Sequence, residues 1–281
     1  MSAAPGRPSQ ARTEAGGEGT PVSDTTTQLV LRAQDAQGVR TLTLNRPDAL
    51  NALSEAMLTA LQAELDDAAR DDSLRVLVLA AAGKAFCAGH DLKEMRAEPS
   101  HDYYRRLFDQ CTKMMLTIQR LPVPVIAKVE GMATAAGCQL VAMCDLAVAA
   151  STARFAVSGV NFGLFCSTPS VALSRNVLRK PAFEMLVTGD FITAQEAREK
   201  GLVNRVAEPA ALDGALAALV QSILGKPRVA LAMGKALFYR QQEVGIAAAY
   251  QDAGATMACN MMDASALEGT QAFIEKRKPN F

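Results

Sequence analysis

The chain of 281 residues lacks the side-chain groupings that hold most protein-bound metals. It has two histidines, and its six cysteines form no Cys-x-x-Cys pair. Structural zinc sites need such residues at short, defined spacings. We therefore expect no metal site and no redox site. The scattered cysteines are best explained as reduced thiols, with Cys138 and Cys144 in an apolar, helix-like stretch as part of the core.

The sequence also has no excess of charge and no long apolar segment. Its 29 basic side chains balance 29 acidic ones, which gives no general attraction to nucleic acid or to an anionic membrane. No apolar run approaches the length of about 20 residues that spans a bilayer. We expect neither nucleic acid nor a membrane as a partner, and a small-molecule substrate instead.

The first part of the chain lacks hydrophobic periodicity. Residues Met1 to Thr27 are rich in Gly, Ala, Ser, Pro and Thr, which predicts a disordered tail over residues 1–27. This tail has no apolar centre of a secretory signal, and Glu14 and Glu18 are untypical of a transit peptide. We expect a cytoplasmic protein, with the mitochondrial matrix as the alternative.

The remainder of the chain has the rhythm of an α/β protein. Nearly half of all residues, 49%, are hydrophobic, which is enough for one substantial core. Apolar strand-like runs alternate with helical periodicity, the runs being 39–44, 74–80, 123–129 and 145–150 and the helices lying near 54–69, 103–119 and 135–143. The run Val76–Leu79 has no polar alternation, which predicts a strand covered on both faces. From about Ala210 onward only helical segments follow, with a break near Gly225–Pro227.

Two short segments carry the strongest functional signal. Ala85–Leu92 and Gly131–Leu140 each follow a predicted strand, and both are rich in small residues. Small residues let a ligand approach the backbone closely, and a helix that begins near Ala135 directs free N–H groups outward. One donor from each segment would stabilise the oxygen of a thioester as it gains negative charge. The pair of segments therefore predicts an oxyanion hole.

These two segments resemble the AGxDL and GCxL motifs of the crotonase (enoyl-CoA hydratase/isomerase) superfamily. The resemblance extends from about Leu29 to Phe281, and Thr134–Val141 and Gly159–Pro169 resemble one branch of the superfamily in particular. Further matches are Asn45–Leu53, Cys144–Asp145, Leu186–Ala197, Gly201–Val203 and Ala272–Lys278.

The resemblance implies the fold, the substrate and the assembly. The fold is an α/β spiral of repeated β-β-α units, with a core over residues 28–209 that holds an acyl-CoA pocket. Residues 210–281 form a C-terminal helical layer that packs subunits into a homo-trimer or hexamer. The substrate is an acyl-CoA thioester, so coenzyme A enters as part of the substrate and no cofactor is bound.

The resemblance also assigns roles to individual residues. The two oxyanion donors are the backbone N–H groups of His90 and Ala136. Positions that line the coenzyme A are Ala49, Leu50, Ala88, His90, Asp91, Leu92 and Ala136, and Lys276 is a further candidate from the C-terminal segment. Asp48 stands where a basic residue is common, which weakens the expected affinity for the phosphates.

Hydratases of this superfamily use two glutamates, and this chain has neither. Gln139 occupies the first position and Gly159 the second. An amide does not exchange a proton usefully near neutral pH, and glycine has no side chain. Since one general acid or base contributes about 10²- to 10⁴-fold, any hydratase activity should be weak. Isomerases that work with the second glutamate alone are disfavoured as well.

Other polar residues near these positions have less specific interpretations. The His90 side chain either takes part in the chemistry or contributes no more than its N–H. Ser158, Asn161, Ser167 and Thr168 either orient a substrate or form an ordinary turn, and Asp145 is expected to be a structural cap. Nothing predicts a reactive Cys166, and no GxSxG motif supplies a nucleophilic serine.

The leading hypothesis is an acyl-CoA-binding enzyme of the hydratase/isomerase type that stabilises a thioester enolate with the N–H groups of His90 and Ala136. One alternative is decarboxylation of a malonyl-type CoA ester, which needs no base. The other is a non-catalytic acyl-CoA sensor or assembly protein that has kept the pocket and lost the acid and the base.

Overall fold

The computed structural model describes residues 1–3 and 28–281. The predicted disordered tail falls mainly on residues 4–27, which lie outside the described residues. The described strands form two sheets. The larger contains β1 (Val30–Gln34), β2 (Val39–Leu44), β3 (Val76–Ala81), β5 (Val125–Val129), β7 (Leu146–Ala150) and β10 (Arg205–Ala207), in that order across the sheet. The smaller contains β4 (Ala85–Cys87), β6 (Met132–Thr134), β8 (Arg154–Ala156) and β9 (Ile192–Thr193).

Most of the pairing in both sheets is parallel. In the larger sheet only β1 pairs antiparallel with its neighbour, and in the smaller sheet only β9 does so. Consecutive strands alternate between the sheets: β3, β5 and β7 belong to the larger one, and β4, β6 and β8 to the smaller one. Each such strand pair is followed by helical structure. This is the expected spiral of β-β-α units.

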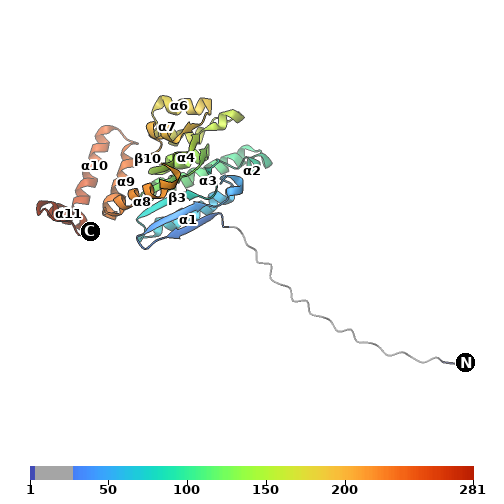
Figure 1. Cartoon of the computed structure of the whole chain (residues 1–281), viewed down its shortest axis with the longest axis horizontal. Coiled ribbons are helices and arrows are strands. Elements are labelled where there is room, and N and C mark those ends of the chain that lie inside the picture. Colours follow the sequence, from blue (N-terminus) through green and yellow to red (C-terminus); the bar gives the residue numbers. More distant parts are fainter. Residues whose placement is uncertain (4–27) are drawn as a thin grey trace.

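The helices surround these sheets (Figure 1). The α-helices are α1 (Glu55–Arg70), α2 (Leu92–Ala97), α3 (His101–Arg120), α4 (Ala136–Met143), α5 (Ser167–Asn176), α6 (Arg179–Thr188), α7 (Ala194–Glu199), α8 (Leu212–Leu224), α9 (Arg228–Gln241), α10 (Ile246–Met261) and α11 (Ala264–Ile274). Short 3₁₀ helices are η1 (Pro47–Ala49), η2 (Ser158–Phe162) and η3 (Pro209–Ala211). The strands and helices predicted from periodicity are confirmed, with ends that agree to within about two residues.

Strand β3 is buried on both faces, as its uninterrupted apolar sequence predicts. Leu77 and Leu79 lie in the main core between the sheets and helices, whereas Val76 and Val78 lie in a second cluster under α8. Cys138 and Cys144 are also core residues, as expected. The central strand therefore joins two apolar layers, and α8 is bound to the outer one.

The C-terminal helices extend away from the body that contains the sheets. In Figure 1, α10 and α11 lie on the side opposite α2. They expose large apolar side chains, including Tyr250, Met257, Met262 and Phe273, which is 85% exposed. Among the described helices no single one is long and apolar enough to span a membrane. Taken together, Pro209–Leu224 and Arg228–Gln241 have the length and the apolar composition of a membrane-spanning segment, but they meet at a bend of 102°.

Asp145 joins helix α9 to the body, which corrects its predicted role as a helix cap. The residue that caps the C-terminus of α4 is Cys144. One Asp145 oxygen accepts hydrogen bonds from the N–H of Val125 (2.6 Å) and the Nζ of Lys235 (2.6 Å), and the other accepts one from the hydroxyl of Tyr239 (2.7 Å). Lys235 is 7% exposed and also donates to the carbonyls of Ile118 and Val123. The cap was predicted because the sequence shows which residues adjoin Asp145 in the chain. It does not show that Lys235 and Tyr239, about 90 residues away, contact it in the fold.

We predict that Asp145→Ala lowers the free energy of unfolding by about 3–5 kcal/mol, because it leaves the charge of Lys235 buried without a counter-ion. Urea denaturation measures this loss. The matched control is Arg105→Ala, which breaks an exposed pair with Asp109 (3.9 Å) and should cost less than about 1 kcal/mol. Equal effects of the two substitutions would contradict the anchoring role.

Candidate active site

The two small-residue segments lie side by side at the edge of the smaller sheet. Strands β4 and β6 pair in parallel, and the hydroxyl of Thr134 donates to the carbonyl of Ala88 at 3.0 Å. Gly137, in the first turn of α4, has no room for a side chain: a Cβ there would lie 2.1 Å from the carbonyl oxygen of Cys87. Glycine at this position therefore permits the close approach of α4 to β4.

This approach brings the two predicted donors together. A Cβ built on Gly89, which precedes His90, would lie 3.3 Å from the nitrogen of Ala136. Ala136 is the first residue of α4, where helical N–H groups have no intrahelical partner. Within residues 28–281, neither the N–H of His90 nor that of Ala136 donates to a protein acceptor. Two free backbone donors thus lie at one place.

A cavity of about 420 Å³ opens beside these donors. Its walls come from the segment after β4 and from α2, from α3, from β6 and the start of α4, from the segment between β8 and α5 with the first turn of α5, and from the turn before β9. They include Ala88, His90, Leu92, Met95, Phe108, Met132, Thr134, Ala135, Ala136, Ser158, Gly159, Asn161, Phe162, Leu164, Phe165, Cys166, Ser167, Thr168, Pro169 and Phe191. Of the described residues that line it, none is Asp, Glu, Lys or Arg.

The His90 side chain does not offer its nitrogens to this cavity. Both ring nitrogens are buried and have no hydrogen bond of ordinary geometry within the described chain. The ring packs edge-to-face on Phe108, with 5.5 Å between the ring centres. Burial lowers the pKa of the imidazole, and the carbonyl of Leu53 opposes this shift. The geometry favours the interpretation that His90 contributes its backbone N–H.

Cys166 is the cavity's thiol, and it is not activated. Burial raises the pKa of this thiol, and the N–H of Gly159, which donates to its sulfur at 3.3 Å, opposes the shift. The thiol is therefore protonated near neutral pH, as the sequence led us to expect. Across residues 1–3 and 28–281 no group of three or more His, Cys, Asp and Glu side chains could hold a metal ion.

Comparison with known proteins identifies the fold family. A family model described as enoyl-CoA hydratase/isomerase matches residues 34–281. The chain belongs to the enoyl-CoA hydratase/isomerase family. Its fold is the crotonase fold predicted from the sequence.

Several family members, known from solved structures or as curated proteins, are similar to this protein over most of its length. A crystal structure described as an enoyl-CoA hydratase from Mycobacterium smegmatis is 69% identical, with a TM-score of 0.89, and covers 90% of this chain and 98% of that one. Human enoyl-CoA hydratase domain-containing protein 3 is 44% identical as a crystal structure, with a TM-score of 0.87 and coverage of 90% and 100%. The human relative belongs to the branch that Thr134–Val141 and Gly159–Pro169 resemble. The resemblance to this branch is therefore confirmed. The 2,3-dehydroadipyl-CoA hydratase of Escherichia coli is 34% identical and covers 90% of this chain and 98% of the relative.

The positions expected to match the two glutamates of hydratases are Gln139 and Gly159, and neither presents a proton-transferring side chain to the cavity. Gln139 is 6% exposed, its side-chain oxygen is buried without a partner among the described residues, and it does not line the cavity. Gly159 does line the cavity, but a Cβ there would lie 2.4 Å from the carbonyl oxygen of Leu164 and 2.7 Å from the Cys166 sulfur. A side chain at position 159 would therefore overlap the backbone of this segment.

Most of the residues expected to line coenzyme A lie close together. Ala49 and Leu50 reach the site because the N–H of Ala88 donates to the carbonyl of Leu50 at 3.1 Å, and Ala88 and Leu92 line the cavity. The Asp91 carboxylate is engaged elsewhere, since it accepts from Arg46 (2.7 Å) and caps α2. Although burial opposes its ionisation, the hydrogen bonds from Arg46 and from the N–H groups of α2 hold its pKa below the ordinary value.

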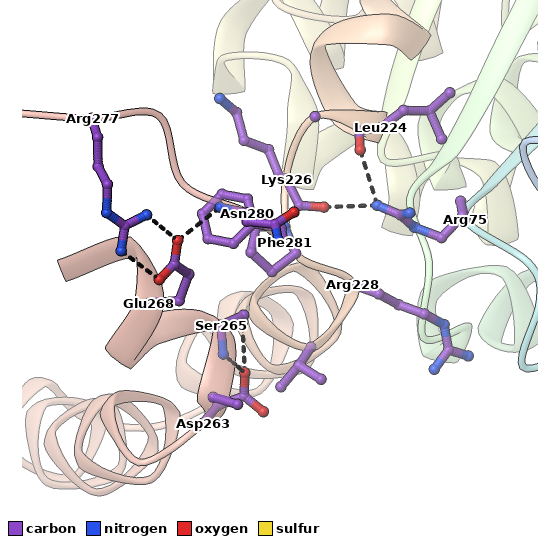
Figure 2. A pocket seen from close by; sticks show the side chains of 14 residues that line it. Arg75, Leu224, Lys226, Arg228, Asp263, Ser265, Glu268, Arg277, Asn280 and Phe281 are labelled. Carbon is purple, nitrogen blue, oxygen red and sulfur yellow. Dashed lines mark hydrogen bonds and ion pairs between the residues drawn. The ribbon is translucent and has the colours of Figure 1, made fainter. Parts of the chain in front are cut away.

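Lys276 is the exception, because the single chain does not bring it to the cavity. It follows α11, at the far end of the molecule in Figure 1. Its neighbour Arg277 lines a different cavity of about 910 Å³, between the α8–α9 turn and α11 (Figure 2). The arginines of this cavity already have partners: Arg277 pairs with Glu268, Arg75 donates to the carbonyls of Leu224 and Lys226, and Arg228 donates to the carbonyl of Leu74. We therefore take the smaller, uncharged cavity as the candidate active site.

The sequence did not indicate some of the cavity's walls. Met95, Phe108 and Phe191 come from α2, α3 and the turn between α6 and β9, and their contribution depends on tertiary packing. Asn51 was also missed: its side chain donates to the carbonyls of Ala82 (2.9 Å) and Ala85 (2.8 Å) and accepts from the N–H of Arg46 (2.8 Å). The asparagine that follows Ala49-Leu50 in the Asn45–Leu53 motif could have indicated that its side chain fixes this loop by hydrogen bonds.

We predict that Gly159→Ala lowers the free energy of unfolding by about 1–3 kcal/mol, because its methyl group overlaps the backbone of Leu164. The control is Gly214→Ala in α8, where a Cβ meets open space and the substitution should stabilise the helix by about 0.5–1 kcal/mol. Thermal denaturation of both variants measures the difference. A Gly159→Ala variant as stable as the parent would contradict the exclusion of a side chain from this position.

Proposed function

We propose that the protein binds an acyl-CoA thioester in the 420 Å³ cavity and stabilises its enolate with the backbone N–H groups of His90 and Ala136. The observation that carries this proposal is the pair of free N–H donors beside an uncharged cavity. Membership of the hydratase/isomerase family supports the choice of an acyl-CoA ligand.

The proposed chemistry rests on electrostatics at the thioester oxygen. When the α-carbon loses a proton or another electrofugal group, the electron pair moves toward this oxygen, and fixed N–H dipoles stabilise the resulting charge. Donors that are already oriented need no reorganisation, and in related oxyanion holes one donor contributes about 2.7–4 kcal/mol to the transition state. The low polarity of the walls strengthens both interactions.

Hydration is the part of the family's chemistry that the cavity supports least. Adding water to an enoyl thioester requires two proton transfers: one removes a proton from the water that attacks the β-carbon, and the other delivers a proton to the α-carbon. The lining has no carboxylate, the Cys166 thiol is protonated and the His90 nitrogens are buried. This lack of proton-transfer groups favours a second candidate function, a non-catalytic acyl-CoA-binding protein. Decarboxylation of a malonyl-type ester needs no base, but no cation lines the cavity to pair with the substrate's carboxylate.

We also propose that the chain assembles as a trimer or hexamer through residues 210–281, while residues 28–209 form the body that contains the cavity. The exposed apolar side chains of α10 and α11 support this assembly. Lys276 can contribute to coenzyme A binding only from a neighbouring copy, since it lies away from the cavity of its own chain.

We propose that the cellular compartment of the protein depends on whether its source is eukaryotic or bacterial. The human and other vertebrate relatives are named as mitochondrial, which supports the matrix rather than the cytoplasm. The similar chain from Mycobacterium smegmatis is bacterial, which supports the cytoplasm. We propose the matrix for a eukaryotic source and the cytoplasm for a bacterial one.

The decisive experiment incubates the purified protein with enoyl-, 3-hydroxyacyl- and malonyl-type CoA thioesters and follows the products by mass spectrometry. We predict that Ala136→Pro, which removes one donor, lowers turnover about 10²- to 10³-fold. The matched control is Ala264→Pro at the first position of α11, where proline is equally well tolerated. Full turnover by a folded Ala136→Pro variant would contradict the assignment, and binding without any conversion by the parent would favour the non-catalytic candidate.

A further inference from the structure

Ala135 has a backbone conformation that normally belongs to glycine. Its φ is 49° and its ψ is −119°, and for a residue with a Cβ such a conformation is strained. The surrounding chain imposes it from both sides: the N–H of Ala135 donates to the carbonyl of Ala156 at 3.0 Å, and its carbonyl accepts from the N–H of Gln139 at 3.0 Å. The strain is therefore a fixed property of the fold.

A glycine would make the same two backbone hydrogen bonds without this strain. The side chain of Ala135 is the only difference between the two residues, and it is one methyl group. Ala135 is one of the residues that line the active-site cavity. It also lies next to both donor segments, since a Cβ built on Gly89 would be 3.0 Å from it and 3.3 Å from the nitrogen of Ala136. The strained methyl group is thus beside the proposed oxyanion hole.

We propose that the methyl group of Ala135 determines specificity by excluding thioesters that carry a substituent on the α-carbon. This inference rests on the proposed function, in which the thioester oxygen lies between the N–H groups of His90 and Ala136. The α-carbon is bonded directly to the carbonyl carbon, so a branch on it projects into the space beside the donors. The substrate class is therefore an α-unbranched acyl-CoA.

The size of the effect follows from the cost of excess volume. An extra methyl or methylene group forced into a packed site weakens binding by about 5- to 150-fold. Removal of the Ala135 methyl group creates space of the same size in the same place. Ala135→Gly should therefore accept the branched thioester, and it should also melt about 2–4 °C higher because the backbone strain is released.

Isothermal titration calorimetry with butyryl-CoA, 2-methylbutyryl-CoA and free CoA tests this inference. The parent protein should bind butyryl-CoA at least about fivefold more tightly than its 2-methyl analogue, and Ala135→Gly should bind the two within about threefold of each other. Ala135→Ser keeps the Cβ and should retain the preference. The control Ala133→Gly removes a methyl group from β6 that lies in the core and not in the cavity, so it should lose stability and retain the preference.

The outcomes separate this inference from the proposed function. Equal binding of both thioesters by the parent, or an unchanged preference in Ala135→Gly, overturns the role of the methyl group while acyl-CoA binding stands. A loss of preference in Ala133→Gly as well also overturns it, because general loosening of the segment would then be the cause. If neither thioester binds more tightly than free CoA, the proposed function itself fails.

Discussion

The close approach of helix α4 to strand β4 determines the geometry of the whole site. Gly137 permits it, because any side chain would meet the carbonyl of Cys87. The approach aligns the free N–H of Ala136 with the segment that supplies the N–H of His90, and it holds Ala135 in a conformation that an L-residue otherwise avoids. The smaller sheet supports this contact, since its strands β4 and β6 pair in parallel. Binding, orientation and the proposed selectivity at the α-carbon all depend on this one packing contact.

The cavity beside that contact combines free backbone N–H donors with a lining whose described residues offer no acid or base for hydration. Two free backbone N–H groups lie beside it, and no carboxylate is among the described residues that line it. Gln139 is not among the residues that line it, and the carbonyl of Leu164 lies where a side chain at position 159 would begin. The segment between β8 and α5 therefore leaves no room for a side chain at position 159.

The long strands and helices could be predicted from the sequence because their patterns extend over many residues. The short strands β4, β6, β8 and β9 could not, since two or three residues show no alternation. The place of His90 and Ala136 at the cavity was predictable from the small-residue motifs, whereas Phe108 and Phe191 join the cavity only through packing. Lys276 shows that a motif match can also mislead about position. The match predicted that Lys276 lies near the ligand, but within one chain it follows α11, away from the cavity. Asp145 was recognised as structural, but its bonds to Lys235 and Tyr239 are too distant in sequence to be read from it.

The most direct test of the oxyanion hole is an infrared measurement on the bound thioester. Butyryl-CoA labelled with ¹³C at the carbonyl gives an isolated stretching band that reports the polarisation of the C=O bond. If the N–H groups of His90 and Ala136 both donate to this oxygen, the band of the bound ligand moves to lower frequency than in water. A band at the solution frequency in a saturated complex would contradict the assignment of these two donors.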